Sequence, residues 1–128
     1  MKRFYIASSL SNRAKVSHLR DMLVSKGWNH CYDWTTNSLP ITEEELHAIG
    51  LAEMNGVQSA DFLIALLPGG KGTHIEIGLA LAFEIPILLY SEDEATFEFE
   101  NLSTFYLMDG VRRVVGTQED LMRAIESL

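Results

Sequence analysis

The chain has 128 residues, of which 47% are hydrophobic, and it carries a formal net charge of −8. This length suits a single domain over residues 1–128, and no apolar run is long enough to span a membrane. The acidic balance argues against a nucleic-acid partner, because phosphate contacts need clustered Lys and Arg. The single cysteine, Cys31, and the absence of a signal-peptide pattern favour a reducing cytoplasm.

Strands and helices are predicted to alternate along the chain. Apolar periodicity and turn residues predict a strand at 4–7, a helix at 12–26 ended by Gly27, a strand at 28–34, a loop at 35–40, and a helix at 42–58 capped by Thr42. The apolar side of the 42–58 helix is expected to carry Leu46, Ile49, Met54 and Val57. A third strand at 62–67 leads through a glycine turn into a mostly buried helix from about Thr73, and a fourth strand follows at 86–90. The fifth strand is expected at 105–108 or 111–115, before an amphipathic helix at 117–128.

This alternation predicts an α/β fold. We expect a flavodoxin-like (Rossmann-type) five-stranded parallel sheet in the order 2-1-3-4-5, with helices on both faces. Ligands of such sheets bind outside the carboxyl ends of the strands, at the switch point between the first and third strands. Tyr5, Ser8 and Ser9 of the first strand should therefore lie near the glycine turn and Glu76.

Glu76 stands one turn into an apolar helix, and two interpretations are open. In the first, Thr73 caps the helix and Glu76 completes a capping box, a pattern that recurs at Thr42 and Glu45. In the second, Glu76 faces the crevice above the sheet, where the helix N-terminus would keep the carboxylate ionised. An ionised carboxylate there suits a nucleophile or a charge stabiliser.

Four motifs carry a resemblance to a known family: FYIASS, ADFLIALLP, the G-T-x-x-E-x-G-x-A pattern from Gly72 to Ala80, and IPILLYS. Over most of its length the chain resembles the nucleoside 2-deoxyribosyltransferase-like family. The resemblance implies that Glu76 is the nucleophile that attacks the anomeric carbon and expels the base, and that Tyr5 orients it. The family places an aspartate about two helical turns before the third strand to protonate the base, and Glu53 falls there. The transferases also borrow a polar residue from a neighbouring subunit, and Asn101 has suitable spacing.

The string PGGKGTHIE is also similar to the P-G-G-x-G-T-x-x-E motif of the lysine-decarboxylase-like phosphoribohydrolases, which release a base from a nucleoside 5′-monophosphate. Two interpretations of Arg13 are open. In the first it binds a 5′-phosphate at the N-terminus of the first helix, and in the second it is a solvated surface arginine. Trp34 either stacks on a base or packs in the core, and Asp33 beside it is a candidate contact for a sugar hydroxyl.

We therefore expect cleavage or transfer at the N-glycosidic bond of a nucleoside or nucleoside 5′-monophosphate, with Glu76, Tyr5 and Glu53 as catalytic residues. The residues expected to bind substrate are Ser8, Ser9, Arg13, Gly69, Gly70, Gly72, Thr73, His74 and Asn101. The alternative is a non-catalytic nucleotide-binding or sensing module in the same crevice, because the transferases usually have an aspartate where this chain has Gly70. We expect no cofactor and no metal site, since the histidines show no metal-ligand spacing, and the resemblance implies a homodimer or larger assembly.

Overall fold

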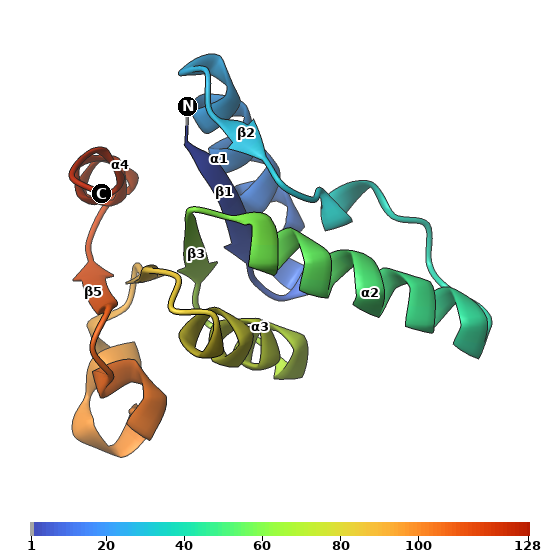
Figure 1. Cartoon of the computed structure of the whole chain (residues 1–128). Helices are drawn as coiled ribbons and strands as arrows, with labels where there is room; N and C mark the ends of the chain where they lie inside the picture. The colour runs from blue at the N-terminus through green and yellow to red at the C-terminus, as the bar shows by residue number, and fades with distance from the viewer. Residues whose placement is uncertain (1) are drawn as a thin grey trace.

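The computed structural model describes residues 2–128 and contains the predicted alternation of strands and helices (Figure 1). The five strands are parallel and lie in the order β2-β1-β3-β4-β5, which confirms the flavodoxin-like arrangement. The strands are β1 (Arg3–Ala7), β2 (Asn29–His30), β3 (Phe62–Leu66), β4 (Ile87–Ser91) and β5 (Val111–Val115). The α-helices are α1 (Arg13–Ser25), α2 (Glu43–Ser59), α3 (Lys71–Ala82) and α4 (Gln118–Glu126).

The helices cover the two faces of the sheet in pairs. α1 and α4 share one face, where Lys26 Nζ lies 2.9 Å from Glu126 Oε1. α2 and α3 pack against each other on the other face (Figure 1). Every residue of β3 and β4 is buried, as expected for strands covered on both sides. No helix within residues 2–128 has the length and apolar character needed to cross a bilayer.

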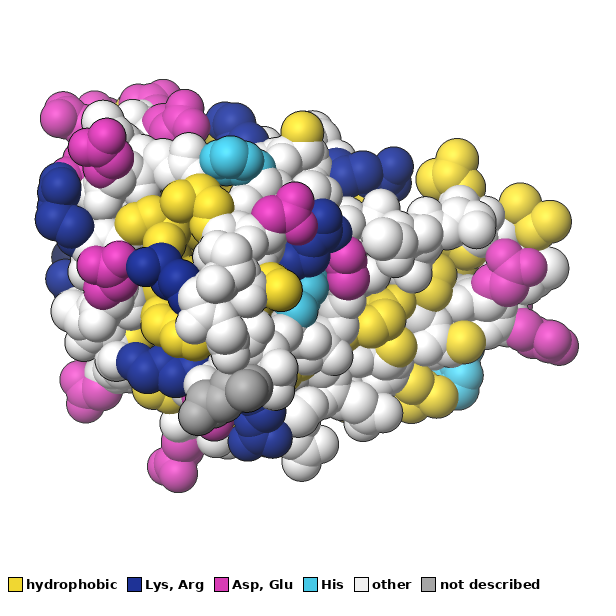
Figure 2. Space-filling model, turned by 90° about the horizontal axis from the view of Figure 1, so that it is seen from above, with side chains coloured by type: hydrophobic (Ala, Val, Ile, Leu, Met, Phe, Trp, Pro, Cys, Tyr) yellow, Lys and Arg dark blue, Asp and Glu magenta, His cyan; other side chains and the backbone are white. Residues whose placement is uncertain are grey.

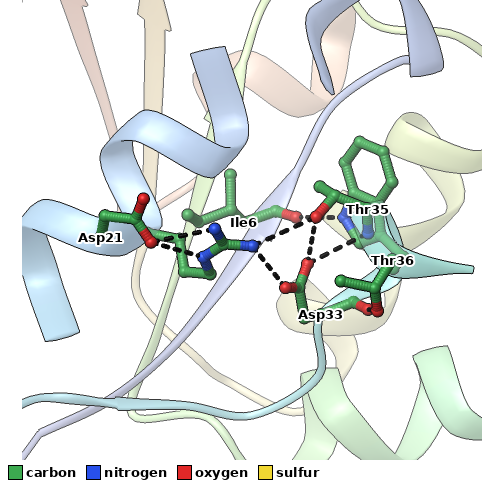
Figure 3. A network of polar contacts seen from close by, with 7 residues as sticks. Ile6, Asp21, Asp33, Thr35 and Thr36 are labelled. Carbon is green, nitrogen blue, oxygen red and sulfur yellow. Dashed lines mark hydrogen bonds and ion pairs between the residues drawn. The ribbon is translucent and has the colours of Figure 1, made fainter. Parts of the chain in front are cut away.

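The second strand is much shorter than the predicted 28–34, because Asp33 starts a turn instead. Its carboxylate accepts a hydrogen bond from the Thr35 backbone N–H at 3.0 Å and caps a 3₁₀ turn, η2 (Trp34–Thr36). Arg20 of α1 pairs with the same carboxylate at 2.5 Å (Figure 3). The chain therefore leaves the sheet after His30. The fifth strand is the second of the two predicted segments, and residues 104–107 form another 3₁₀ turn, η5 (Thr104–Leu107).

Two expectations about α3 were wrong. The helix begins at Lys71 rather than Thr73, and the Gly70 N–H donates to Thr73 Oγ1 at 3.3 Å. Thr73 therefore lies inside the first turn, and Glu76 cannot form a capping box with it. The helix is also less buried than expected, since only Thr73, Glu76, Ile77 and Ala80 are buried and Ile75 is 65% exposed.

The cap of α2 was predicted correctly, but its apolar side was not. Thr42 Oγ1 accepts from the Glu45 N–H at 3.1 Å, as expected for an N-cap. Of the side chains expected to point inward, Val57 is buried, whereas Leu46 is 57% and Met54 is 47% exposed. For Leu46 the physical reason is that the N-terminal part of α2 extends beyond the sheet (Figure 1), so it has no core to pack on.

Candidate active site

A cavity of about 380 Å³ lies at the switch point, between the ends of β1 and β3 and the helices α2 and α3. It brings together most of the residues singled out in the sequence. Eight of the twelve residues expected to act in catalysis or substrate binding line it: Ser8, Ser9, Arg13, Glu53, Gly70, Gly72, Thr73 and Glu76. The rest of the wall comes from η1 (Leu10–Asn12), η2, the loop before α2 and the start of α2 itself.

Glu76 and Tyr5 form a buried pair at this cavity. The side chain of Glu76 is 5% exposed and Tyr5 is fully buried, and the Tyr5 hydroxyl donates a hydrogen bond to Glu76 Oε2. The backbone of α2 holds the ring in place, since a Cβ at Gly56 would stand 3.0 Å from Tyr5 Cε2. Three elements, β1, α2 and α3, thus fix the carboxyl of Glu76.

The electrostatics of Glu76 differ from the expectation. Burial raises its pKa to about 9, and the nearby Glu53 carboxylate adds to this, while the Tyr5 hydrogen bond opposes it. Burial and the negative charge around it also raise the pKa of Tyr5, which stays a neutral donor. Glu76 is therefore protonated at neutral pH in the unliganded protein. The prediction of an ionised carboxylate was wrong, because desolvation outweighs the field of the helix N-terminus.

The end of β1 is tied to the glycine turn by hydrogen bonds. Ser8 Oγ donates to the Leu66 carbonyl at 2.7 Å and accepts from Asn12 Nδ2 at 2.8 Å. Asn12 Nδ2 also reaches the Pro68 carbonyl at 3.2 Å. Arg13, exposed at the start of α1, has no ion-pair partner within residues 2–128. Its guanidinium is therefore available to an anion at this end of the cavity.

The glycine turn contributes open backbone to the cavity. A Cβ added at Gly70 or Gly72 would meet no atom within 4 Å, so packing does not require a glycine at either position. Gly69 is different, since a Cβ there would stand 2.5 Å from Thr73 Cγ2. The absence of side chains at Gly70 and Gly72 leaves the space beside Glu76 free.

The structure does not bring Gly69, His74 and Asn101 into the Glu76 cavity. All three line a neighbouring hollow of about 380 Å³ on the other side of the turn. His74 Nδ1 lies 2.9 Å from the Gly70 carbonyl, which can only accept, so Nδ1 carries the proton and Nε2 accepts from the Tyr106 hydroxyl at 2.7 Å. Asn101 Nδ2 donates to the Ala95 carbonyl at 2.6 Å. His74 and Asn101 thus make contacts within their own chain.

Trp34 and Asp33, the two candidates at the end of the second predicted strand, lie in different surroundings. Trp34 lines the cavity, and its indole N–H donates to the Ile6 carbonyl at 2.8 Å, which fixes the ring as a wall. Asp33 does not line the cavity. Its carboxylate is held by Arg20 and by the side chain and backbone of Thr35 (Figure 3).

Sequence reasoning missed one wall of the cavity. Asn37, Ser38, Leu39 and Pro40 of the predicted loop line it. Leu46 and Ile49, for which the periodicity predicts a packing role, line it as well. Leu39 is 77% exposed. An apolar residue in a polar loop, without a period that would bury it, is the signal that could have marked this wall.

A flavodoxin-like parallel sheet with a buried Glu–Tyr pair at its switch point defines an α/β protein with a candidate catalytic carboxyl group. The chain belongs to the nucleoside 2-deoxyribosyltransferase family, whose model matches residues 4–122. Among curated proteins, no sequence matches the chain.

Three solved structures are similar in fold. The CMP N-glycosidase BcmB of Clostridium botulinum has a TM-score of 0.70 at 20% identity, covering 98% of this chain and 99% of that one. A conserved protein of Enterococcus faecalis V583 has a TM-score of 0.72 at 23% identity, covering 99% and 98%. The 2-deoxyribosyltransferase of Bacillus psychrosaccharolyticus has a TM-score of 0.71 at 18% identity, covering 98% and 91%. These similarities show a shared fold.

The raised pKa of Glu76 predicts how stability changes with pH. Between its ordinary pKa of 4.5 and about 9, the unfolded chain has lost the proton that the native state keeps, so the free energy of unfolding falls as pH rises. Glu76→Gln mimics the neutral acid and removes this loss. We expect the variant to match the wild type near pH 5 and to be more stable by on the order of 1–3 kcal/mol near pH 8, measured by urea unfolding.

Glu44→Gln, at an exposed position in the first turn of α2, serves as the control and should show no such gain at the higher pH. A Glu76→Gln protein that is less stable than the wild type at both pH values would show that the native carboxyl is ionised.

Proposed function

We propose that this protein cleaves or transfers at the N-glycosidic bond of a nucleoside or nucleoside 5′-monophosphate, with Glu76 as the nucleophile. The observation that carries the proposal is the buried Tyr5–Glu76 pair in an open cavity, in a chain that belongs to the nucleoside 2-deoxyribosyltransferase family. A fixed carboxylate can capture or stabilise the oxocarbenium-like carbon that forms as the base departs.

The carboxyl groups of Glu76 and Glu53 can supply the proton that the departing base takes up. Tyr5 occupies Oε2 of Glu76, and Glu53 lies close enough to influence the proton of Glu76. In the proposed step, Glu76 passes its proton to Glu53 and becomes the carboxylate nucleophile. Glu53 then donates that proton to the nitrogen of the base as the bond from this nitrogen to the anomeric carbon breaks. The same carbon bonds to Glu76, and water or a second base releases the sugar. No cofactor is needed.

The 5′ end of the substrate would lie toward Ser8, Ser9 and Arg13. These residues line one end of the cavity, beside the N-terminus of α1, where a phosphate finds a free guanidinium and hydroxyl groups. A nucleoside 5′-monophosphate is therefore the preferred substrate class in this proposal. The solved CMP N-glycosidase of similar fold is consistent with it.

A non-catalytic nucleotide-binding module in the same cavity is the second candidate. Two features favour it: burial raises the pKa of Glu76 to about 9, and Gly70 leaves no side chain in the turn. A neutral carboxyl is a poor nucleophile but a good hydrogen-bond donor to a bound sugar hydroxyl.

Turnover of a substrate panel separates the two candidates. The purified protein is incubated with ribonucleosides, deoxyribonucleosides and their 5′-monophosphates, with and without a second base, and free base is followed by chromatography. We expect release from a 5′-monophosphate, and a loss of at least about 1,000-fold in rate in Glu76→Ala, because the nucleophile is removed. Full turnover in Glu76→Ala would refute the mechanism. Intact ligand that raises the melting temperature would favour the binding module.

A pair of glycine substitutions tests whether the open side of the turn receives substrate. Gly72 and Gly78 both lie in α3, and a Cβ at either one meets no atom within 4 Å. Because Ala favours helix over Gly, each Ala variant should be more stable by up to about 1 kcal/mol. Gly72→Ala should also raise KM by about tenfold or more, which corresponds to about 1.4 kcal/mol of lost binding, while Gly78→Ala should leave it unchanged. Equal KM values would place the substrate elsewhere.

We further propose that two copies of the chain associate through α2. We place the protein in a reducing cytoplasm, where the thiol of Cys31 stays free. Large apolar side chains are exposed on α2 and on the loop before it: Leu39, Ile41, Leu46, Leu51 and Met54. Figure 2 shows hydrophobic side chains gathered on the part of the molecule that α2 forms. Leu39 and Leu46 also line the cavity, so a second copy on this surface would close the mouth above Glu76.

The association predicts a dimer or larger assembly at micromolar concentration, detected by light scattering after size exclusion. Leu51→Glu should shift the protein toward the monomer, because a charge would be buried in the contact. Val24→Glu on α1 is the matched control, since Val24 is 49% and Leu51 is 48% exposed. A wild-type protein that remains monomeric would contradict the proposal, as would equal effects of the two variants.

A further inference from the structure

A second cavity, of about 430 Å³, lies on the other face of the sheet. It sits between α1 and α4, at the carboxyl ends of β3 and β4, and shares no lining residue with the Glu76 cavity. Ligands of parallel α/β sheets bind outside the carboxyl ends of the strands, so this place is suited to a ligand. Its volume is within the range of small-molecule sites.

The interior of this α1–α4 cavity is apolar. Its wall includes five buried side chains from both helices and two strands: Leu19, Leu66, Leu67, Tyr90 and Leu121. The Tyr90 hydroxyl donates to the Gly116 carbonyl at 2.9 Å, which ties the ring in place. Apolar walls of this kind suit a flat ring system whose faces gain by leaving water.

The rim of the α1–α4 cavity is polar and favours hydrogen-bond donors. Lys15 pairs with Glu92 at 3.4 Å, and His18 lies on the same rim. Asp93 adds a second carboxylate, which also accepts a hydrogen bond from the Ala95 N–H at 2.9 Å. Asn12 donates its amide N–H groups to Ser8 Oγ and to the Pro68 carbonyl, and Gln118 donates one to Met22 Sδ. No hydrogen bond within residues 2–128 uses the amide oxygen of either residue. Carboxylates at the mouth repel a phosphate, and free amide oxygens accept from N–H groups.

One residue connects this cavity to the candidate active site. Asn12 lines the α1–α4 cavity and donates to Ser8 Oγ and to the Pro68 carbonyl. Ser8 lines the Glu76 cavity, and Pro68 opens the glycine turn. A ligand that hydrogen-bonds to Asn12, or displaces its present contacts, would change the structure on both sides of the sheet.

We propose that the α1–α4 cavity is a second binding site, for an uncharged planar heterocycle of nucleobase size that carries N–H donors and no phosphate. This inference does not depend on catalysis at Glu76, since the cavity, its apolar wall and its free acceptors lie on the opposite face. Occupancy of this site would act on the Glu76 cavity through Asn12.

Amide chemical shifts test the proposal. The ¹⁵N-labelled protein is titrated with cytosine, adenine and adenosine 5′-monophosphate as probes. We expect the free bases to shift the amides of Ala14, Lys15, Glu92 and Gln118 with a Kd at or below about 1 mM. The 5′-monophosphate should act on these amides at least tenfold more weakly, because its phosphate meets the acidic rim.

Two tryptophan variants supply the control. Ala14 is exposed and lines the cavity, so Ala14→Trp should fill it from the mouth and abolish these shifts without touching the core. Val24→Trp, on the same helix and away from the cavity, should preserve them. If Ala14→Trp does not fold, Gln118→Ala takes its place and should weaken base binding by at least about threefold.

Several outcomes would overturn the proposal. These are shifts confined to the glycine turn and Glu76, no response to millimolar base, tighter binding of the 5′-monophosphate at the α1–α4 amides, or equal loss in both tryptophan variants. Shifts at the α1–α4 amides in a protein that releases no base from any nucleotide would support this site and refute only the catalytic proposal.

Discussion

The burial of the Glu76 carboxyl against the Tyr5 hydroxyl is the constraint on which the site depends. A carboxyl group taken out of water is costly unless it finds a hydrogen-bond partner. Here the partner comes from the interior strand β1, and the close approach of α2 at Gly56 holds its ring. The register of β1 on β3, which pairs Tyr5 with Leu63, sets where α3 must lie for the two side chains to meet.

The same burial gives Glu76 two opposed properties. It fixes the carboxyl in one orientation, which the proposed role as a nucleophile requires, and it raises the pKa to about 9, which keeps the group neutral. A neutral acid must lose its proton before it can act as a nucleophile. The presence of a second carboxyl, Glu53, on the wall of the same cavity offers a place for that proton. Position and protonation state are therefore set by the same desolvation.

The turn after β3 divides the carboxyl edge of the sheet. On one side Gly70 and Gly72 open toward Glu76, and on the other His74 and Tyr106 tie the turn to η5. Behind it, Asn12 joins the turn to the end of β1 and faces the α1–α4 cavity. The turn after β3 thus forms part of the wall of three cavities, so a change in its backbone would alter all three.

The sequence by itself determined the sheet order and the meeting of Tyr5 with Glu76. Alternating strands and helices allow few topologies, and parallel strands in this order bring the ends of β1 and β3 together. Tertiary structure alone decided the rest. The pairing of Arg20 with Asp33 across 13 residues helps to end β2 early, and the Tyr106 hydroxyl holds His74 away from the cavity that the sequence had assigned to it. The protonation of Glu76 and the exposure of α2 depend on which distant side chains cover them. Local sequence patterns do not predict burial of this long-range kind.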